Sequence, residues 1–139
     1  MLDDTDLKIV EQLQKDGRQT YTAIAEKIGK TESTVRKRIK EMMRNGIISN
    51  FSVQLNPVAM GYSVAIVGVD TDPAKLLEVA EKLTKFEEIH SVKLSTGDHH
   101  IIAEIWAKER KLTEYIEEIS TLKGVERVCP AIVLERLKP

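Results

Sequence analysis

The chain has 139 residues, of which 42% are hydrophobic and 31% are charged. This composition is typical of folded globular proteins and excludes a wholly disordered chain. The formal net charge is −1, so no overall positive charge indicates a nucleic-acid partner, and charge has to be compared segment by segment. Cys129 is the single cysteine, which excludes an intramolecular disulfide and fits a reducing compartment.

Membrane insertion and export are both disfavoured by the residue pattern. Residues 49–69 carry no charge, but their Asn, Gln, Pro and Gly residues argue against a transmembrane helix. Acidic residues at positions 3, 4 and 6 occupy the place where a signal peptide has basic residues. We therefore expect a cytoplasmic protein.

The first fifty residues differ from the rest in charge and periodicity. They hold ten basic and eight acidic side chains, whereas residues 51–139 hold 11 basic and 14 acidic ones. Their apolar spacing predicts three helices, between residues 3 and 17, over 21–28 and over 31–45. In the first of these helices, Leu7, Val10 and Leu13 have helical apolar spacing, and Ile9 pairs with Leu13 four positions later.

The second and third predicted helices have the spacing of a helix-turn-helix. Ala25 supplies a small residue for a close helix crossing, and Gly29, four positions later, supplies freedom for a tight turn. Val35 then packs the third helix inward. This arrangement makes residues 31–45 the candidate recognition helix.

The candidate recognition helix carries five basic and two acidic side chains. A basic helix face that is merely solvated is the alternative, but the helix-turn-helix spacing favours double-stranded DNA. We expect Arg36 or Lys37 to bond guanine and Glu32 to accept from cytosine, with the remaining contacts made to phosphates. The candidate DNA-binding residues are Tyr21, Thr22, Thr31, Glu32, Ser33, Thr34, Arg36, Lys37, Arg38, Lys40 and Arg44.

Strand signals begin after Gly46, and the fold class is α+β. Residues 47–55 are expected to form an extended arm, followed by strands over 63–69, 90–96, 99–107 and 125–137 and helices over 73–83 and 109–122. The resulting βαββαβ order predicts a ferredoxin-like sandwich. We expect a helix-turn-helix domain over 1–50, a linker strand and loop over 51–62, and an oligomerisation or effector domain over 63–139.

The predicted sheet is too apolar to leave one face in water. Ala65, Val67, Ile102 and Trp106 are the residues on which this inference rests. We therefore predict that two copies dimerise sheet to sheet. A dimer presents two recognition helices about 34 Å apart, which suits a palindromic site.

The segment from Ser95 to His100 holds the most varied chemistry of the second half. Exposed turn amides could bind the carboxylate of an amino acid, and Asp98 could bind its ammonium group. The alternative is an ordinary hairpin turn, in which Gly97 supplies backbone freedom and the side chain of Asp98 hydrogen-bonds to the turn. A metal site from Asp98, His100 and His90 is disfavoured, because adjacent strand residues point to opposite faces. We expect no cofactor.

The whole chain resembles the Lrp/AsnC (feast/famine) transcription regulators, particularly their archaeal LrpA-like branch. The resemblance rests on motifs that occur in the family's order along the chain. They are Leu2-Asp3-x-x-Asp6-x-x-Ile9, Ala25-x-x-x-Gly29, Ser33-Thr34-Val35-Arg36-x-Arg38-Ile39, Asn45-Gly46-x-Ile48, Asn56-Pro57-x-x-x-Gly61-Tyr62, Thr96-Gly97-Asp98 and Gly124-Val125.

The resemblance implies a DNA-binding regulator, without enzyme activity, that forms homodimers, often assembles them into octamers and can regulate its own gene. It also implies an amino-acid effector bound between dimers, near the turn after the second strand of the sheet. Carried over, the effector residues are Thr96, Gly97, Asp98, His100, Pro130 and Ala131. The family's turn reads Gly-Asp-Tyr-Asp, whereas His99 and His100 follow Asp98 here, so one carboxylate is absent.

Two rival functions remain as alternatives. Sirohaem decarboxylases resemble this family in fold and use histidines, which His99 and His100 would supply, but such an enzyme has no need of a basic third helix. A ferredoxin-like RNA-binding module stacks bases on aromatic side chains, and only 4% of the residues are aromatic.

Overall fold

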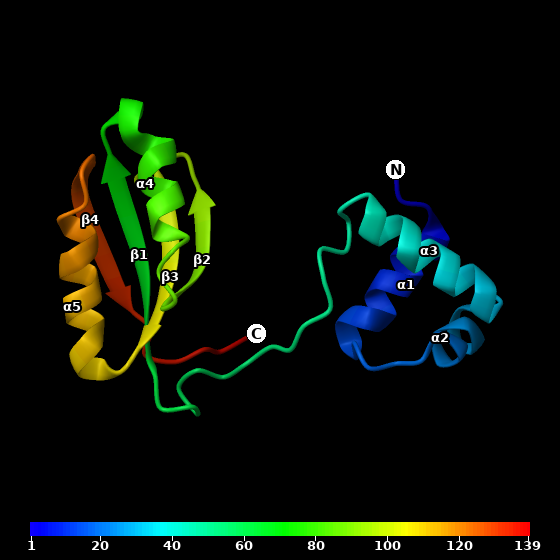
Figure 1. The fold of residues 1–139 in the computed structure, drawn as a ribbon. Coiled ribbons are helices and arrows are strands. Elements are labelled where there is room, and N and C mark those ends of the chain that lie inside the picture. The colour runs from blue at the N-terminus through cyan, green and yellow to red at the C-terminus, as the bar shows by residue number, and fades with distance from the viewer. The chain divides into compact units, whose positions relative to one another are not determined.

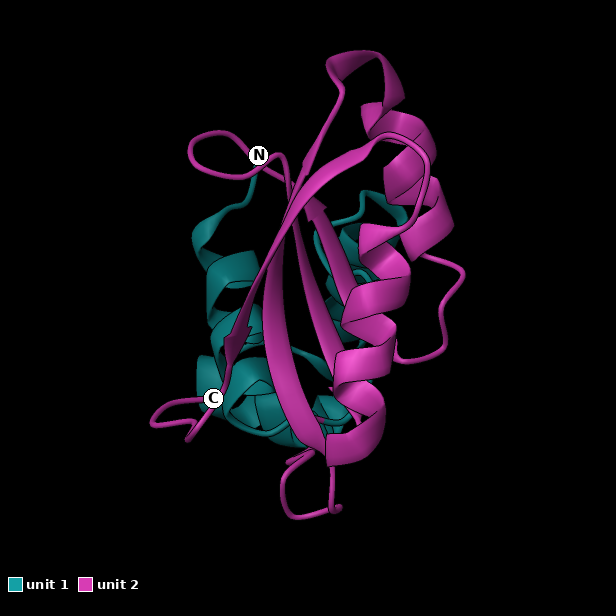
Figure 2. Ribbon diagram, turned by 90° about the vertical axis from the view of Figure 1, so that its left-hand side faces the viewer, with its two compact units in different colours: residues 1–53 teal, residues 54–139 magenta.

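The computed structural model describes all 139 residues, and the chain forms two compact units, Met1–Val53 and Gln54–Pro139 (Figure 2). The first unit is helical throughout. It contains α1 (Asp4–Lys15), α2 (Tyr21–Ile28) and α3 (Glu32–Arg44). The second unit contains the strands and the other two α-helices (Figure 1).

Local capping signals set the ends of the three N-terminal helices. Asp3, Thr20 and Thr31 are the N-caps of α1, α2 and α3, and each side chain accepts a hydrogen bond from a backbone N–H in the first turn of its helix. Gly29 ends α2 with a φ of 68°, a left-handed conformation that favours glycine. The predicted positions of the helices and of the turn between α2 and α3 are confirmed.

The three helices share one small apolar core. Fully buried residues from each helix meet there, and Ala25 is buried at the expected position. They are Ile9, Ile24, Ala25, Val35, Ile39 and Met42. Of the predicted apolar residues of α1, Ile9 is fully buried in this core, whereas Leu7 is 54% exposed and lies outside it.

The segment after α3 contains no strand. Residues 47–62 form bends, turns and irregular backbone, so the expected linker strand is not formed. The apolar alternation of this segment finds no neighbouring strand with which to pair in a single chain, and isolated extended backbone does not form a sheet.

The second unit is the predicted βαββαβ sandwich. Its elements are β1 (Ser63–Thr71), a short 3₁₀ turn η1 (Pro73–Lys75), α4 (Leu76–Leu83), β2 (Ile89–Leu94), β3 (Ile101–Ala107), α5 (Glu109–Ser120) and β4 (Val125–Ile132). The strands form one antiparallel sheet in the order β2-β3-β1-β4. Both helices cover the same face of this sheet (Figures 1 and 2).

Five strand boundaries differ from the prediction. The first strand ends two residues later than predicted, at Thr71, and the second ends two residues earlier, at Leu94. The second strand of the sheet starts one residue earlier, at Ile89, and the third strand starts at Ile101 instead of residue 99, because His99 and His100 belong to the hairpin loop. The last strand ends at Ile132 instead of residue 137. Beyond Ile132 there is one further hydrogen bond to β1, from the N–H of Val133 to the carbonyl oxygen of Val64. Val64 is the second residue of β1, so the partner strand extends no further in this direction.

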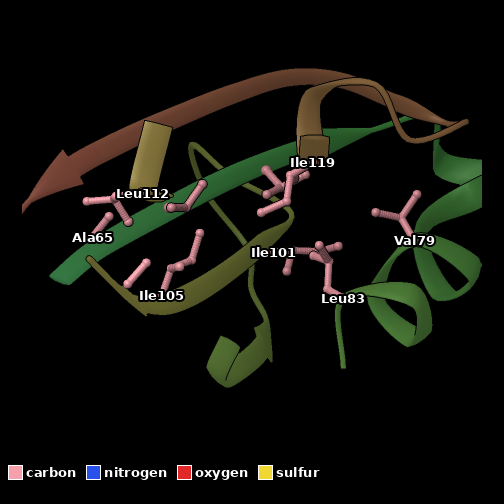
Figure 3. Close-up of a cluster of buried hydrophobic side chains, with 10 residues drawn as sticks. Ala65, Val79, Leu83, Ile101, Ile105, Leu112 and Ile119 are labelled. Carbon is pink, nitrogen blue, oxygen red and sulfur yellow. The ribbon is translucent and has the colours of Figure 1, made fainter. Parts of the chain in front are cut away.

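The core of the second unit lies between the sheet and its two helices (Figure 3). Val67 of β1 and Ile105 of β3 are fully buried there beside Leu83 of α4 and Ile119 of α5. Ala65 also belongs to this core. The dimerisation prediction used Ala65 and Val67 as residues of the open sheet face. The structure corrects this, because both lie on the face that the helices cover.

The open face of the sheet carries the alternate residues of each strand. Val64 pairs across the sheet with Trp106, Ile66 with Glu104, and Gly68 with Ile102. The ring of Trp106 stacks on His90 of β2, with 3.8 Å between ring centroids, and its indole N–H donates to Glu104 at 2.7 Å. Ile102 and Trp106 thus lie on an apolar face that no helix of the second unit covers.

Candidate nucleic-acid interface

The outward face of α3 carries more basic than acidic side chains. Val35, Ile39 and Met42 are buried, so the residues between them point away from the core. A shallow groove of about 350 Å³ runs along this outward face. It is lined by Ser33, Arg36, Lys37, Lys40, Glu41 and Arg44.

Three cations of this groove are not neutralised. Lys37, Lys40 and Arg44 are exposed, and none of them forms an ion pair within the chain. One row of uncompensated positive charge on a helix of 13 residues is a site to which a polyanion can bind.

Arg36 lies between an acidic and an aromatic side chain. Its Nε donates to Oε1 of Glu32 at 3.1 Å, and Nη2 contacts the same oxygen. The guanidinium also lies over the ring of Tyr21 at the start of α2, with its carbon 5.5 Å from the ring centroid. The hydrogen bond that Arg36 donates to Glu32 raises the pKa of Arg36, and this group stays charged at any physiological pH.

Arg38 does not face the groove. Its Nη1 lies 2.5 Å from Asp3 and 3.3 Å from Asp6, both near the start of α1. The pair with Asp6 is largely shielded, since only 10% of the Asp6 side chain is exposed. Arg38 thus makes a contact that holds α3 against α1, and this pairing disfavours its predicted contact to a phosphate.

The remaining predicted DNA residues lie at helix starts. Thr31 and Thr34 share a hydrogen bond of 2.8 Å, and Thr31 also accepts the N–H of Thr34, so both hydroxyls take part in the cap of α3. Ser33 and Thr22 are exposed in the first turns of α3 and α2. The platform that Tyr21 offers to Arg36 was missed from sequence, although Tyr21 itself was among the predicted residues.

The loop between β2 and β3 is closed by one backbone hydrogen bond, from the N–H of Ser95 to the carbonyl oxygen of His100 at 2.9 Å. Thr96, Gly97 and Asp98 between them are exposed. Gly97 has a φ of 103°, so the turn depends on its conformational freedom. The carboxylate of Asp98 makes no hydrogen bond to the turn, contrary to the hairpin interpretation, and remains available to a ligand.

The two adjacent histidines of this loop point to different partners. The ring of His99 lies over Gly68 on the open face of the sheet, and its Nδ1 is 3.1 Å from Asp70. Nδ1 of His100 instead accepts the N–H of Thr71 at 3.0 Å. Neither Gly68 nor Asp70 was predicted, because both come from β1, some thirty residues earlier.

The six predicted effector residues do not meet within one chain. The loop joins the ends of β2 and β3, whereas Pro130 and Ala131 lie on β4, beyond β3 and β1 in the sheet. Pro130 pairs with Val67 of β1. The β1 residue nearest the loop is instead Val69, which pairs with Ile101 at the start of β3. A single chain therefore does not close a pocket from these six residues.

No group of three His, Cys, Asp or Glu side chains lies close enough together to hold a metal ion. His90 stacks on Trp106, away from the loop that carries Asp98 and His100. The structure also contains no helix that is long and apolar enough to span a membrane.

Two family models match the chain. Residues 2–49 match a winged helix-turn-helix DNA-binding model, and residues 64–139 match the Lrp/AsnC ligand binding domain. The two matches correspond to the helical unit and to the sandwich.

Curated and solved relatives agree with these matches. The HTH-type transcriptional regulator LrpA of Pyrococcus horikoshii is 49% identical over 141 residues, which cover 99% of this chain and 100% of that protein. The crystal structure of the leucine response regulatory protein of Mycobacterium tuberculosis has a TM-score of 0.86 and 28% identity, covering 99% of this chain and 96% of that one. A Neisseria meningitidis regulator in complex with L-Met has a TM-score of 0.86 at 24% identity, covering 100% and 94%.

The helix-turn-helix with its basic third helix and the sandwich together define a DNA-binding transcription regulator. The chain belongs to the Lrp/AsnC family, with archaeal relatives such as the Pyrococcus protein. The curated relatives are transcriptional regulators, so the comparisons give no support to the sirohaem decarboxylase alternative.

Proposed function

We propose that α3 binds the major groove of double-stranded DNA and reads its sequence there. The observation that carries this proposal is the row of exposed cations, Lys37, Lys40 and Arg44, which have no acidic partner within the chain. An α-helix fits the major groove, and uncompensated Lys and Arg side chains gain free energy there by releasing counterions from the phosphates.

The roles divide along the helix. Arg36 and Lys37 in the N-terminal half contact base edges, as the first turns of a recognition helix do, while Lys40 and Arg44 neutralise phosphates. Thr22 and Ser33 are exposed hydroxyls at helix starts and suit further phosphate contacts. Arg38 is omitted from this set because Asp3 and Asp6 hold it.

The DNA-binding protein is proposed to be a homodimer that assembles further, up to an octamer. Residues 63–139 dimerise through the open sheet face, where Ile66, Ile102 and Trp106 gather away from the helices, and residues 51–62 link this domain to residues 1–50. Two copies of α3 then meet successive turns of a palindromic site, about 34 Å apart.

An amino acid is the proposed effector. The related Neisseria regulator was solved with L-Met, and the exposed loop offers free amides beside the unpaired carboxylate of Asp98. Because Pro130 and Ala131 lie across the sheet from this loop, the site is completed only where two copies meet. The proposed place of action is the cytoplasm, and the proposed first target is the promoter of the protein's own gene.

Fluorescence anisotropy with the DNA upstream of its own gene tests these proposals. We expect saturable binding that weakens linearly with log salt concentration and that changes when one of the amino acids is added. Asp98→Ala is expected to remove that change while DNA binding persists. Equal affinity for this DNA and for a shuffled duplex would contradict sequence-specific binding.

A further inference from the structure

The contacts of Arg36 leave one defined edge of its guanidinium free. Glu32 accepts from Nε and Nη2, which together form the side edge of the group. The guanidinium carbon also lies over the ring of Tyr21, 5.5 Å from its centroid. At the end edge, Nη1 makes no hydrogen bond within the chain, and Nη2 keeps the second of its two N–H groups free beside it.

That free edge has the geometry to bind guanine. Two parallel N–H groups can bond O6 and N7 of guanine at once, which is a common specific contact in the major groove. A side chain already held in one orientation loses less conformational freedom on binding than a mobile one. Lys40, which has no such partner, carries a rotatable point charge that suits a phosphate.

We propose that Glu32 and Tyr21 are positioning residues that hold Arg36 for a guanine base in the major groove. Glu32 thereby acts as a specificity determinant even where it contacts no base. Its carboxylate also lies beside the cationic groove, so it weakens binding to DNA of any sequence by repelling phosphates. This inference rests on the proposed placement of α3 in the major groove.

Two other arrangements predict different behaviour. If Glu32 itself read cytosine, then Arg36→Lys would leave the preference at that base pair intact, because the Glu32 carboxylate would still accept from N4 of cytosine. If Arg36 bound a phosphate, then its replacement by lysine would leave sequence preference intact. Glu41 provides a control for charge alone, because it lines the same groove and its carboxylate forms no ion pair with Arg36.

The test is a selection of duplexes from a random-sequence DNA pool by the full chain, followed by anisotropy measurements. The proteins are the unchanged chain, Glu32→Ala, Glu32→Gln, Glu41→Ala and Arg36→Lys. Affinity is measured for the selected duplex, for the same duplex with each guanine replaced by adenine, and for a shuffled duplex.

We expect one guanine per half-site whose replacement weakens binding by the unchanged chain roughly ten-fold. Glu32→Ala and Arg36→Lys should reduce that preference to less than about three-fold. Glu32→Gln should keep it, since an amide oxygen still accepts from Arg36. Glu41→Ala and Glu32→Ala should both strengthen binding to shuffled DNA, but Glu41→Ala should keep the preference.

Tyr21 is tested with a conservative pair. Tyr21→Phe keeps the ring and should keep the guanine preference, whereas Tyr21→Leu removes the ring and should reduce it. Because Tyr21 also packs against the core of the helical unit, the melting temperature of each variant is measured beside its affinity.

The outcomes separate the two proposals. Retained guanine preference in Glu32→Ala, or loss of preference in Glu32→Gln as complete as in Glu32→Ala, overturns the positioning role while leaving DNA binding by α3 intact. A pool from which the unchanged chain selects no common sequence overturns the proposed sequence-specific function itself.

Discussion

Arg38 of α3 contacts Asp3, the N-cap of α1, with 2.5 Å between Nη1 and Oδ2. Asp3 and Asp6 also exchange both hydrogen bonds of a capping box, at 3.2 and 2.9 Å. One cation therefore completes a network that joins the start of α1 to the middle of the recognition helix. The network fixes α3 on its α1 side and leaves the opposite side free.

This network makes Arg38 and Lys40 differ in their effect on DNA binding. Lys40→Ala should reduce the slope of log affinity against log salt by about one unit, since one phosphate contact is lost. Arg38→Ala should leave the slope unchanged, because the guanidinium of Arg38 is already paired with the carboxylates of Asp3 and Asp6. The measurement is anisotropy with one duplex at several salt concentrations.

A lower salt slope in Arg38→Ala, equal to that of Lys40→Ala, would return Arg38 to the set of phosphate contacts. Thermal unfolding of the same variants serves as the control. Arg38→Ala should lower the melting temperature of the helical unit, whereas Lys40→Ala should not, because Lys40 is exposed and pairs with nothing.

The carboxyl of Asp3 gives the helical unit an acid-sensitive element. The N–H of Asp6 and, after it, the hydrogen bond from Arg38 lower the pKa of Asp3 below its usual 3.8. A lowered folded-state pKa stabilises the fold above the unfolded value, and this stabilisation is lost as the pH falls through the folded value. We therefore expect the loss to begin below about pH 4.

Carbon-detected NMR titration of Asp3 checks this expectation. Its midpoint should lie below 3.8 in the unchanged chain and should rise in Arg38→Ala. The rise should be incomplete, since the N–H of Asp6 still donates to the carboxylate. A midpoint that does not move in Arg38→Ala would contradict the Asp3–Arg38 contact.

Gly29 tests the turn of the helix-turn-helix. A side chain at Gly29 meets open space but has to adopt a φ of 68°, so the cost of Gly29→Ala is a backbone cost. We expect the free energy of unfolding of the helical unit to fall by about 1–2 kcal/mol, measured by hydrogen exchange of the Ile24 amide.

Gly17→Ala is the matched control for that substitution. Gly17 does not have a positive φ, and its added carbon would make an ordinary contact of 3.7 Å. Equal exchange rates in Gly29→Ala and in the unchanged chain would show that the turn does not need a left-handed residue.

The open sheet face predicts the assembly state. Ile102→Glu places a charge at the centre of the proposed dimer interface and should yield monomers in light scattering after size exclusion. Leu77→Glu is the control, since Leu77 is 71% exposed on α4, on the covered side of the sheet. A dimer that persists in Ile102→Glu would place the interface elsewhere.

Helix positions were predictable because their signals are local. Thr20, Thr31 and Gly29 each act within four residues of their own position, so the sequence around them is sufficient. The paired halves of the sandwich followed from the alternation of strand and helix patterns along the chain.

The errors concern contacts between distant segments. Arg38 looked free because its partners lie 32 and 35 positions earlier. His99 looked like part of a strand, but Asp70 and Gly68 hold its ring against a neighbouring strand. The last strand was predicted to reach residue 137, but it ends at Ile132, close to where its partner β1 begins.

The most direct test of the central claim is protection of guanine N7 from dimethyl sulfate, because N7 lies in the major groove. With a selected duplex, the account predicts two protected patches about one helical turn, or 10 base pairs, apart. Protection should disappear in the Lys37→Ala/Lys40→Ala variant at the same protein concentration. Undiminished guanine protection in that variant, or protection confined to adenine N3 in the minor groove, would contradict binding through α3.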